Sequence, residues 1–228
     1  EKIFADQGRR FYDPRLKVTV GGITFDNPLI VGAGWDKEGK CIKSLHRLGF
    51  ASIEVGTVVK EPQSGNKPPR QFAYRGVALN SLGFNSPGME EVAKNLRCYY
   101  YEPEIPVGVS LGKNKLTSDK DAPREYAQVA EYLYQLGDYF TINVSSPNTP
   151  GLRGLQDKGP LTDIVQAVLD RMKFHGGKKP LFVKIAPDLT FPAIDDVLDV
   201  IYSNRLAGIV ATNTTNNPEI KNKYPMWA

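Results

Sequence analysis

The chain has 228 residues and a formal net charge of +4, with 24% charged and 41% hydrophobic residues. This ordinary composition excludes a disordered chain, and the charge is too small to indicate a nucleic-acid-binding protein. Two cysteines and two histidines are too few for a disulfide scaffold or for a metal site built from these residues, so we predict no metal. No apolar run approaches the roughly 20 residues of a membrane span.

The elements predicted along the chain alternate between strands and helices. Residues 17–25 alternate polar and apolar side chains around Gly21–Gly22, which predicts a small hairpin with a primed turn. Apolar runs that predict buried strands follow at 28–32, 52–55, 107–111, 139–144, 181–185 and 208–212. The segments between them predict helices at 38–48, 87–99, 122–135, 159–175 and 192–203. This pattern is typical of a (β/α)₈ TIM barrel of the α/β class, with about six of eight βα units present and the hairpin at the barrel bottom.

Two strands of such a barrel are not accounted for, since only residues 213–228 follow the sixth predicted strand. A parallel sheet that stops at six strands keeps two unpaired edges. Either the chain continues beyond Ala228, or an open doubly wound sheet forms, or a partner closes the barrel, and we favour the first. We therefore expect residues 16–228 to form a barrel domain truncated before strands seven and eight. Residues 1–15 are expected to be the end of an upstream helical or linker segment.

Polar residues follow the predicted strands where a barrel enzyme carries its active site, at the carboxyl ends. They are glycines, amides, hydroxyls and lysines with few acids, at 32–37, 56–58, 112–115, 143–151, 184 and 212–215. This set suits a planar, polar, anionic ligand approached closely by backbone. An asparagine in such a loop, taken singly, is more often a turn or cap residue than a functional one. Lys184 lies inside an apolar strand, where a buried ammonium group must be paired, and this position indicates a functional role. The histidines and cysteines lie in predicted helices, away from these ends, and are not expected to be catalytic.

Residues 143–153, Asn-Val-Ser-Ser-Pro-Asn-Thr-Pro-Gly-Leu-Arg, resemble the signature of class 2, quinone-linked dihydroorotate dehydrogenases. Further segments resemble the family in the same order, from about residue 16 to residue 215: 34–37, 54–58, 62–66, 80–85, 112–115, 184–188 and 212–214. The resemblance implies an FMN-dependent barrel enzyme of pyrimidine (UMP) biosynthesis that oxidises dihydroorotate to orotate and passes electrons to a membrane quinone. It also implies peripheral attachment, through a segment absent here, to a bacterial cytoplasmic or inner mitochondrial membrane.

The same resemblance assigns roles to individual residues. Ser146 matches the catalytic base, a serine in class 2 and a cysteine in class 1, and Thr149 and Phe84 flank the route of its proton. The matched FMN contacts are Ala33, Gly34, Gly56, Thr57, Ser110, Asn143, Lys184 and Thr212. The matched substrate contacts are Lys37, Asn80, Ser81, Leu82, Gly83, Phe84, Asn143, Asn148, Asn213 and Thr214.

Two departures from the family pattern accompany these matches. Ser110 stands where the family usually has an asparagine against the flavin, and the phosphate-binding loops after strands seven and eight are not matched. The alternative to an enzyme is a barrel-derived structural or assembly subunit without an FMN phosphate site. A third hypothesis keeps the enzyme class but changes the substrate or the electron acceptor, with fumarate and nicotinamide as alternatives to quinone.

Overall fold

The computed structural model describes residues 13–74, 76–101, 103–149, 151–176, 179–221 and 223. The predicted upstream segment, 1–15, lies mostly outside these residues. Its last part forms a short 3-10 helix, η1 (Pro14–Leu16), which is capped by the carboxylate of Asp13 accepting the backbone N–H of Arg15 at 2.9 Å.

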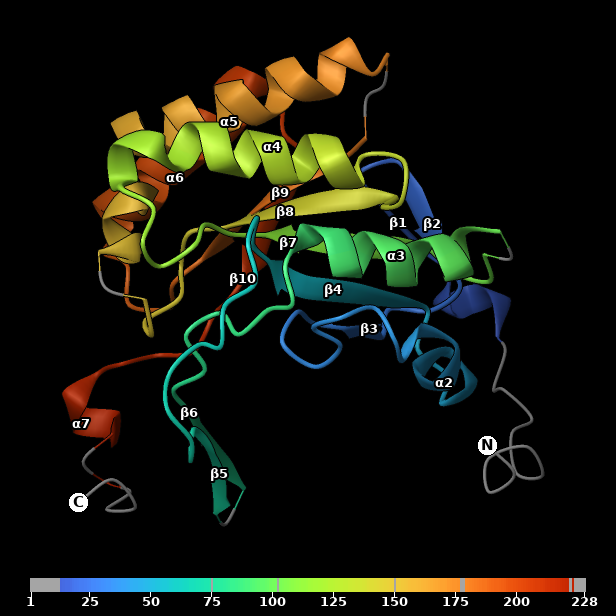
Figure 1. Ribbon diagram of the computed structural model, residues 1–228, viewed down its shortest axis with the longest axis horizontal. Helices are drawn as coiled ribbons and strands as arrows, with labels where there is room; N and C mark the ends of the chain where they lie inside the picture. Colours follow the sequence, from blue (N-terminus) through green and yellow to red (C-terminus); the bar gives the residue numbers. More distant parts are fainter. Residues whose placement is uncertain are drawn as a thin grey trace.

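A six-stranded parallel sheet forms the centre of the molecule. Its strands lie side by side in chain order: β3 (Ile30–Val31), β4 (Ser52–Val58), β7 (Val107–Leu111), β8 (Tyr139–Asn143), β9 (Leu181–Ile185) and β10 (Gly208–Ala211). The sheet curls as part of a barrel, with β3 and β10 as its edge strands (Figure 1). Every predicted strand is present, and the prediction of six parallel βα units is confirmed. The predicted burial of 28–32 and 208–212 is wrong, since β3 has one exposed and one buried residue and β10 has no buried residue, because each of these edge strands has a neighbouring strand on one side only.

Helices cover the outer face of the sheet (Figure 1). They are α2 (Ile42–Arg47), α3 (Met89–Tyr100), α4 (Ala122–Leu133), α5 (Lys158–Phe174) and α6 (Phe191–Asn204), with the short α7 (Pro218–Lys221) near the end of the chain. In α5, Leu161, Ile164, Val165 and Val168 recur at helical spacing and are all buried, because this stripe packs into the hydrophobic core. The helix is followed by Gly176 at φ 77°, a conformation that glycine adopts without strain.

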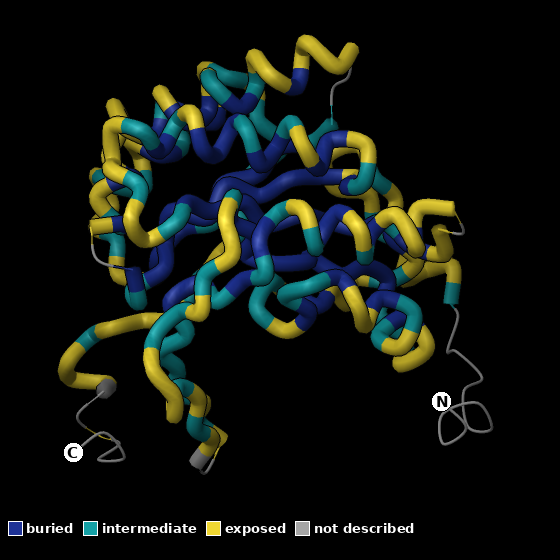
Figure 2. The backbone as a smooth tube through the Cα atoms, viewed as in Figure 1, coloured by how far each residue is buried: buried dark blue, intermediate teal, exposed yellow. Residues whose placement is uncertain are grey.

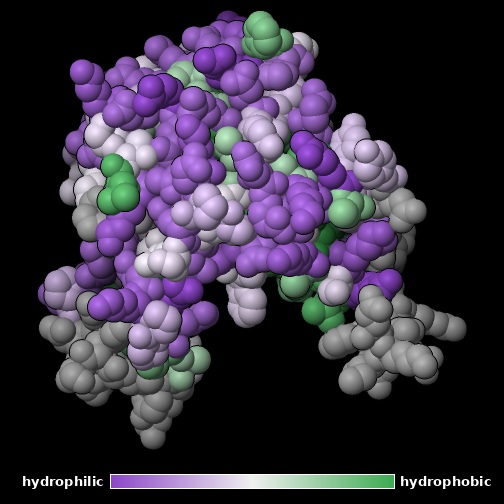
Figure 3. Space-filling model, in the orientation of Figure 1, coloured by the Kyte–Doolittle hydropathy of each residue, from purple (hydrophilic) through white to green (hydrophobic). Residues whose placement is uncertain are grey.

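Burial follows this layered arrangement. Every residue of β4, β7 and β8 is buried, as expected for parallel strands covered on their helical side and curled around a common interior. Figure 2 shows these strands as a buried layer beneath partly exposed helices. The outward surfaces of the helices in this view are mainly hydrophilic, with isolated hydrophobic side chains (Figure 3). The apolar core therefore lies between sheet and helices, and polar side chains are left for the barrel interior and the strand ends.

The predicted N-terminal hairpin is formed by β1 (Val18–Val20) and β2 (Ile23–Phe25), which pair antiparallel. Gly21 and Gly22 have φ values of 58° and 83°, which a primed turn requires. A Cβ on Gly21 would lie 3.0 Å from Ala207 Cβ, just before β10, so the hairpin packs against the amino ends of the strands. This confirms its predicted place at the barrel bottom.

A second hairpin, β5 (Gln71–Tyr74) and β6 (Val77–Asn80), is absent from the predicted elements. Each strand has four residues, too few for alternation to be distinguished from an extended loop. The hairpin projects from the sheet on the side opposite β1 and β2, with α7 beside it (Figure 1).

One predicted helix, 38–48, is shorter than expected. The carboxylate of Asp36 accepts the backbone N–H groups of Gly39, Lys40 and Cys41 at 2.9, 3.0 and 2.8 Å. These bonds hold residues 36–41 in a turn, so α2 begins only at Ile42.

Candidate active site

The residues at the carboxyl ends of the strands meet at one rim of the sheet. Gly56 on β4 lies in register with Ser110 on β7, and Asn143 on β8 lies in register with Lys184 on β9. The loops after β3 and β4 are joined directly, because the Gly34 N–H donates to the Gly56 carbonyl at 2.8 Å. The expected clustering of glycines, amides, hydroxyls and lysines is therefore present in the fold.

A buried hydrogen-bond network runs across four of these strand ends. Asn143 Nδ2 donates to Thr57 Oγ1 at 2.7 Å, and Thr57 Oγ1 lies 3.0 Å from Ser110 Oγ. On the other side of Asn143, its Oδ1 accepts from Ser145 Oγ at 3.1 Å, and Asn213 Nδ2 donates to Ser145 Oγ at 3.1 Å. Of these residues, Ser145 is the one absent from the predicted site set, although it lies inside the segment 143–153 that carried the resemblance.

Ser146 belongs to a second, adjacent network. Its Oγ accepts the backbone N–H of Asn148 at 3.3 Å, and its side chain is only 5% exposed. The Asn148 carboxamide donates to Asn80 Oδ1 at 3.0 Å, while Asn66 Nδ2 donates to the Asn148 carbonyl at 3.4 Å. Because Ser146 acts as acceptor in its hydrogen bond, its hydroxyl proton remains available for transfer.

A cavity of about 440 Å³ opens beside this second network, between the β5–β6 hairpin, the loop after β8 and the chain following β10. Asn80, Asn148 and Thr214, all predicted substrate contacts, contribute to its wall. The volume falls in the range of small-molecule sites.

Phe84 and Thr149 lie close to these networks in buried positions. Phe84 has φ 52° and is 6% exposed, and its ring packs against Gly112 at the end of β7. A Cβ on Gly112 would come within 2.6 Å of Thr57 Cγ2 and 3.1 Å of Phe84 Cε2, so only glycine fits there. The Oγ1 of Thr149 is buried and has no hydrogen-bond partner within the described chain. An unpaired buried hydroxyl costs about 1–3 kcal/mol, which indicates a place for a ligand or water contact.

Positive charge gathers at the same rim. Burial, together with the neighbouring positive charges of Arg70 and Lys184, lowers the pKa of Lys37 to about 8. Three cationic side chains held this close favour an anionic ligand, since an anion would relieve their mutual repulsion.

Lys184 also faces an acidic neighbour in the barrel interior. Burial raises the pKa of Glu54, while the charge of Lys184 and a hydrogen bond from Thr141 Oγ1 at 2.8 Å oppose that rise. Glu54 and Lys184 line a cavity of about 430 Å³ together with Gly32 and Ala211. The lysine inside an apolar strand is thus accompanied by the buried carboxyl group of Glu54, which is not among the predicted site residues.

The remaining predicted residues contribute mainly backbone. The Ser81 N–H donates to the Arg70 carbonyl at 2.8 Å, and the Leu82 carbonyl accepts the Asn66 N–H at 3.1 Å. Gly83 packs against the Asn66 side chain, and Ala33 lies in the same loop as Gly34. Thr212 is exposed, and its hydroxyl donates to the Asn213 carbonyl at 3.0 Å.

Comparison with known proteins identifies the family of this chain. A model of the family described as dihydroorotate dehydrogenase matches residues 15–226. The chain belongs to the dihydroorotate dehydrogenase family.

A relative from Synechococcus sp. (strain JA-2-3B'a(2-13)), named dihydroorotate dehydrogenase (quinone), is 47% identical over 207 residues, covering 90% of this chain and 53% of the relative. A relative of the same name from Natronomonas pharaonis is 44% identical over 217 residues, covering 94% of this chain and 60% of the relative. The chain thus spans little more than half the length of these curated relatives.

Solved structures of the family share the fold. The ligand-free dihydroorotate dehydrogenase of Eimeria tenella superimposes with a TM-score of 0.84 at 35% identity, covering 93% of this chain and 65% of that chain. The complex of the Eimeria enzyme with ferulenol gives a TM-score of 0.83 at 34% identity, covering 92% of this chain and 62% of that chain. The six-stranded sheet is therefore the part of a dihydroorotate dehydrogenase TIM barrel that these residues form.

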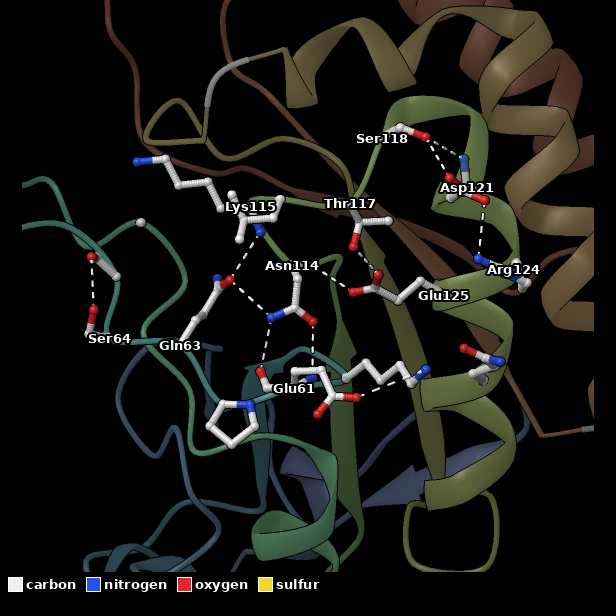
Figure 4. A pocket seen from close by; sticks show the side chains of 16 residues that line it. Glu61, Gln63, Ser64, Asn114, Lys115, Thr117, Ser118, Asp121, Arg124 and Glu125 are labelled. Carbon is white, nitrogen blue, oxygen red and sulfur yellow. Dashed lines mark hydrogen bonds and ion pairs between the residues drawn. The ribbon is translucent and has the colours of Figure 1, made fainter.

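A polar network outside the rim supports the loop that carries Phe84. Gln63 Nε2 donates to the Phe84 carbonyl at 2.9 Å, and Gln63 Oε1 accepts from Asn114 Nδ2 at 3.0 Å. Figure 4 shows Asn114 between Glu61, Gln63 and Glu125, at the wall of a cavity of about 620 Å³. The Asn114 carboxamide also bonds to the backbone N–H and carbonyl of Glu61, and the Asn114 N–H donates to Glu125 Oε1 at 2.5 Å, so Asn114 ties the loops at this cavity together.

Proposed function

We propose that the protein of which this chain is part oxidises dihydroorotate to orotate in pyrimidine biosynthesis and transfers the electrons to a quinone. The observation that carries the proposal is the buried Ser146 hydroxyl beside the Asn80–Asn148 pair, at the same rim as Lys37. This substrate requires a proton acceptor, carboxamides that hydrogen-bond to the polar edge of its ring, and a cation that pairs with its carboxylate. The described structure contains no observation that favours a non-catalytic subunit instead.

FMN is the proposed cofactor, in keeping with a family whose members use a flavin. A Cβ placed on Gly32 or Gly34 meets no atom within 4 Å, so open space lies at these strand ends where a flat ring would approach the backbone. Thr57, Ser110, Asn143 and Lys184 would hold the ring from their strand ends, with Ser110 supplying one hydrogen bond in place of an asparagine carboxamide. Bound at these residues, FMN would supply the hydride acceptor and the route by which electrons reach a quinone.

The chain's own residues are proposed to carry out the proton transfer and to bind the substrate carboxylate. Ser146 takes the proton from the ring carbon, and because a serine hydroxyl is a weak base it needs a route that removes its own proton. The unpaired Thr149 hydroxyl is proposed to lie on that route, and the Phe84 ring limits access of water to it. Lys37 holds the substrate carboxylate, for which a point charge suffices.

The carboxamides fix the orientation of the ring. Asn80, Asn148 and Asn213 offer both donors and acceptors to the ring edge, and Thr214 adds a hydroxyl. Lys184 supplies a fixed positive charge where negative charge develops.

The direct experiment uses the full-length protein. We expect a yellow protein that reduces an artificial electron-accepting dye only when dihydroorotate is present, and faster with a quinone than with fumarate or a nicotinamide nucleotide. A colourless full-length protein that stays inactive after addition of FMN would contradict the proposal. A preference for fumarate or a nicotinamide nucleotide would keep the oxidation but refute the quinone.

The quinone also implies attachment of the whole protein to the surface of a membrane, which we propose together with the acceptor. Within the described ranges, no helix combines the length and apolar character needed to cross a bilayer. Co-sedimentation of the full-length protein with quinone-containing vesicles tests the attachment.

The pKa of Lys37 predicts how substrate affinity depends on pH. Because this pKa lies at about 8, the ammonium form that pairs with a carboxylate is present below pH 8 and is lost as pH rises through it. We expect KM for dihydroorotate to be flat near pH 7 and to rise towards tenfold per pH unit above pH 8. In Lys37→Arg the guanidinium stays charged, so its KM is expected to be independent of pH over this range. A parental KM that is constant up to pH 9.5 would remove Lys37 from this role.

Removal of the Gln63 side chain tests whether this side chain holds Phe84 in position. Gln63→Ala deletes one hydrogen bond to the Phe84 carbonyl, worth about 1 kcal/mol, and is expected to raise KM for dihydroorotate roughly fivefold. Gln128→Ala, which changes another glutamine that lines the same cavity, serves as the control and should leave KM unchanged. Equal KM values for the two variants would show that Gln63 does not position Phe84.

A further inference from the structure

Arg153 joins the loops of three neighbouring strands. It lies in η3 (Leu152–Gln156), after β8, and its Nη1 donates to Asp188 Oδ2 and to Asn216 Oδ1, both at 2.8 Å. Its Nη2 donates to the Thr214 carbonyl at 3.0 Å, and its Nε donates to the Ser145 carbonyl at 3.3 Å. One guanidinium thus contacts the loops that follow β8, β9 and β10.

Asp188 completes this junction from the loop after β9. Its second carboxylate oxygen accepts from the Thr215 hydroxyl, and Oδ2 also accepts the Asn216 N–H at 3.3 Å. Although burial opposes the shift, hydrogen bonds from Thr215 and Arg153 hold the pKa of the Asp188 carboxyl below its usual range. The carboxylate is therefore ionised and paired near neutral pH, and it ties residues 214–216 to Arg153.

The position of residues 213–217 depends strongly on this junction. They follow the edge strand β10, and the backbone of Asn213 is anchored to the sheet by one bond, from its N–H to the Ile185 carbonyl at 2.9 Å. Beyond Asn213, the contacts to the loops after β8 and β9 pass through Arg153 and Asp188. The guanidinium and carboxylate are 23% and 26% exposed, so water screens their attraction less than that of a surface pair.

We propose that Arg153 is a positioning residue that sets the spacing between the loop of the base, Ser146, and the loop of the ring-binding residues Asn213 and Thr214. The link to catalysis rests on the proposed function, whereas the ordering of residues 213–217 does not. A guanidinium suits this task because its planar set of five N–H donors can reach several acceptors at once, and a lysine ammonium on a flexible stem cannot hold the same set.

The first experiment measures backbone amide exchange in the full-length protein. In Arg153→Gln we expect the amides of Thr214 and Asn216 to exchange at least about tenfold faster than in the parent, since charge-assisted hydrogen bonds that hold the loop are lost. The amides of α5 should keep their parental rates. Arg153→Lys should retain no more than part of the protection, and parental protection in this variant would overturn the need for a guanidinium.

The second experiment separates KM from kcat. Arg153→Gln is expected to raise KM for dihydroorotate by about 10–100-fold while kcat falls less than about fivefold, because the ring-binding loop is displaced and the base is kept. The matched control is Arg171→Gln, which removes an arginine paired with Glu131 at 3.6 Å between the outer helices and should leave both values unchanged. If Arg153→Gln does not fold, Asp188→Asn weakens the same junction with little change of shape and carries the same expectations.

The outcomes distinguish a failure of the positioning role of Arg153 from a failure of the proposed function. Unchanged exchange of residues 213–217 in Arg153→Gln or Asp188→Asn overturns the positioning role. Faster exchange with unchanged KM in an active enzyme overturns its link to the substrate. If the parent does not oxidise dihydroorotate, the proposed function fails, while the exchange measurement still decides whether Arg153 orders this loop.

Discussion

Replacement of Ser146 by alanine is expected to slow the reduction of bound flavin by dihydroorotate by about 10²–10⁴-fold, the usual effect of losing a positioned base. The residue is 5% exposed, and among the described residues its hydroxyl has one hydrogen bond, as acceptor from the Asn148 N–H. Its loss removes little packing, so flavin content and thermal stability should be nearly unchanged. Rapid mixing of the oxidised protein with dihydroorotate, followed at the flavin absorbance, measures the rate directly.

Two further measurements define the role of this hydroxyl. Ser146→Cys restores an ionisable group at the same place and should recover part of the rate, which a purely structural role would not require. Reduction of the Ser146→Ala flavin at the parental rate would mean that another group takes the proton. Thr149, with its unpaired buried hydroxyl, would then be the next candidate.

Replacement of Lys184 by methionine has the second-largest expected effect. Methionine keeps most of the volume and removes the charge, so we expect flavin binding to weaken about 10–100-fold, as for loss of a charge-assisted hydrogen bond. Flavin reduction at saturating FMN should slow by about 10²–10³-fold, since a fixed charge that stabilises the transition state is missing. Titration of the apoprotein with FMN and a measured reduction potential test the two effects separately.

A second lysine at the opposite end of the barrel provides the control. Lys179, just before β9, donates to the carbonyls of Tyr134 and Gly137 at 2.6 Å, and burial lowers its pKa. Lys179→Met should reduce stability but leave FMN affinity and potential unchanged, because it lies near the barrel bottom. If Lys184→Met kept the parental potential at full occupancy, the ammonium of Lys184 would instead serve mainly as a partner for Glu54.

Because Glu54 lies near Lys184, an effect of Lys184→Met on the flavin has to be distinguished from an effect on Glu54. Its Oε1 is buried without a hydrogen-bond partner among the described residues, and Lys184 is the cation that favours its ionised form. Removing Lys184 is therefore expected to raise the pKa of Glu54 further. Comparison of Lys184→Met with the double variant Lys184→Met/Glu54→Gln shows how much of any stability change comes from this carboxyl group.

The strands and helices were largely predictable from local pattern. The runs 107–111 and 181–185 coincide with β7 and β9, because short apolar segments bounded by Gly, Pro or charged residues have few alternatives to a buried strand. Where prediction fell short, an unforeseen polar contact or a short element was responsible. The Asp36 carboxylate delays the start of α2, and the four-residue strands of β5 and β6 are too short to show a period.

The candidate site was predictable to the level of its strand ends and family segments. Asn143 contacts Thr57 and Asn213, and Asn148 contacts Asn80, although these partners come from distant parts of the chain. The individual catalytic and binding roles remain predictions.

The type and order of the strands and helices of the parallel sheet follow from the amino-acid sequence, because periodic burial of apolar side chains is a local property that each segment carries alone. The pairing of polar groups depended on tertiary structure. Glu54 near Lys184, Gln63 on Phe84 and Arg153 on Asp188 each join residues far apart in the chain. Such contacts arise only when the sheet curls and brings its strand ends to one rim, and no local pattern encodes which donor then meets which acceptor.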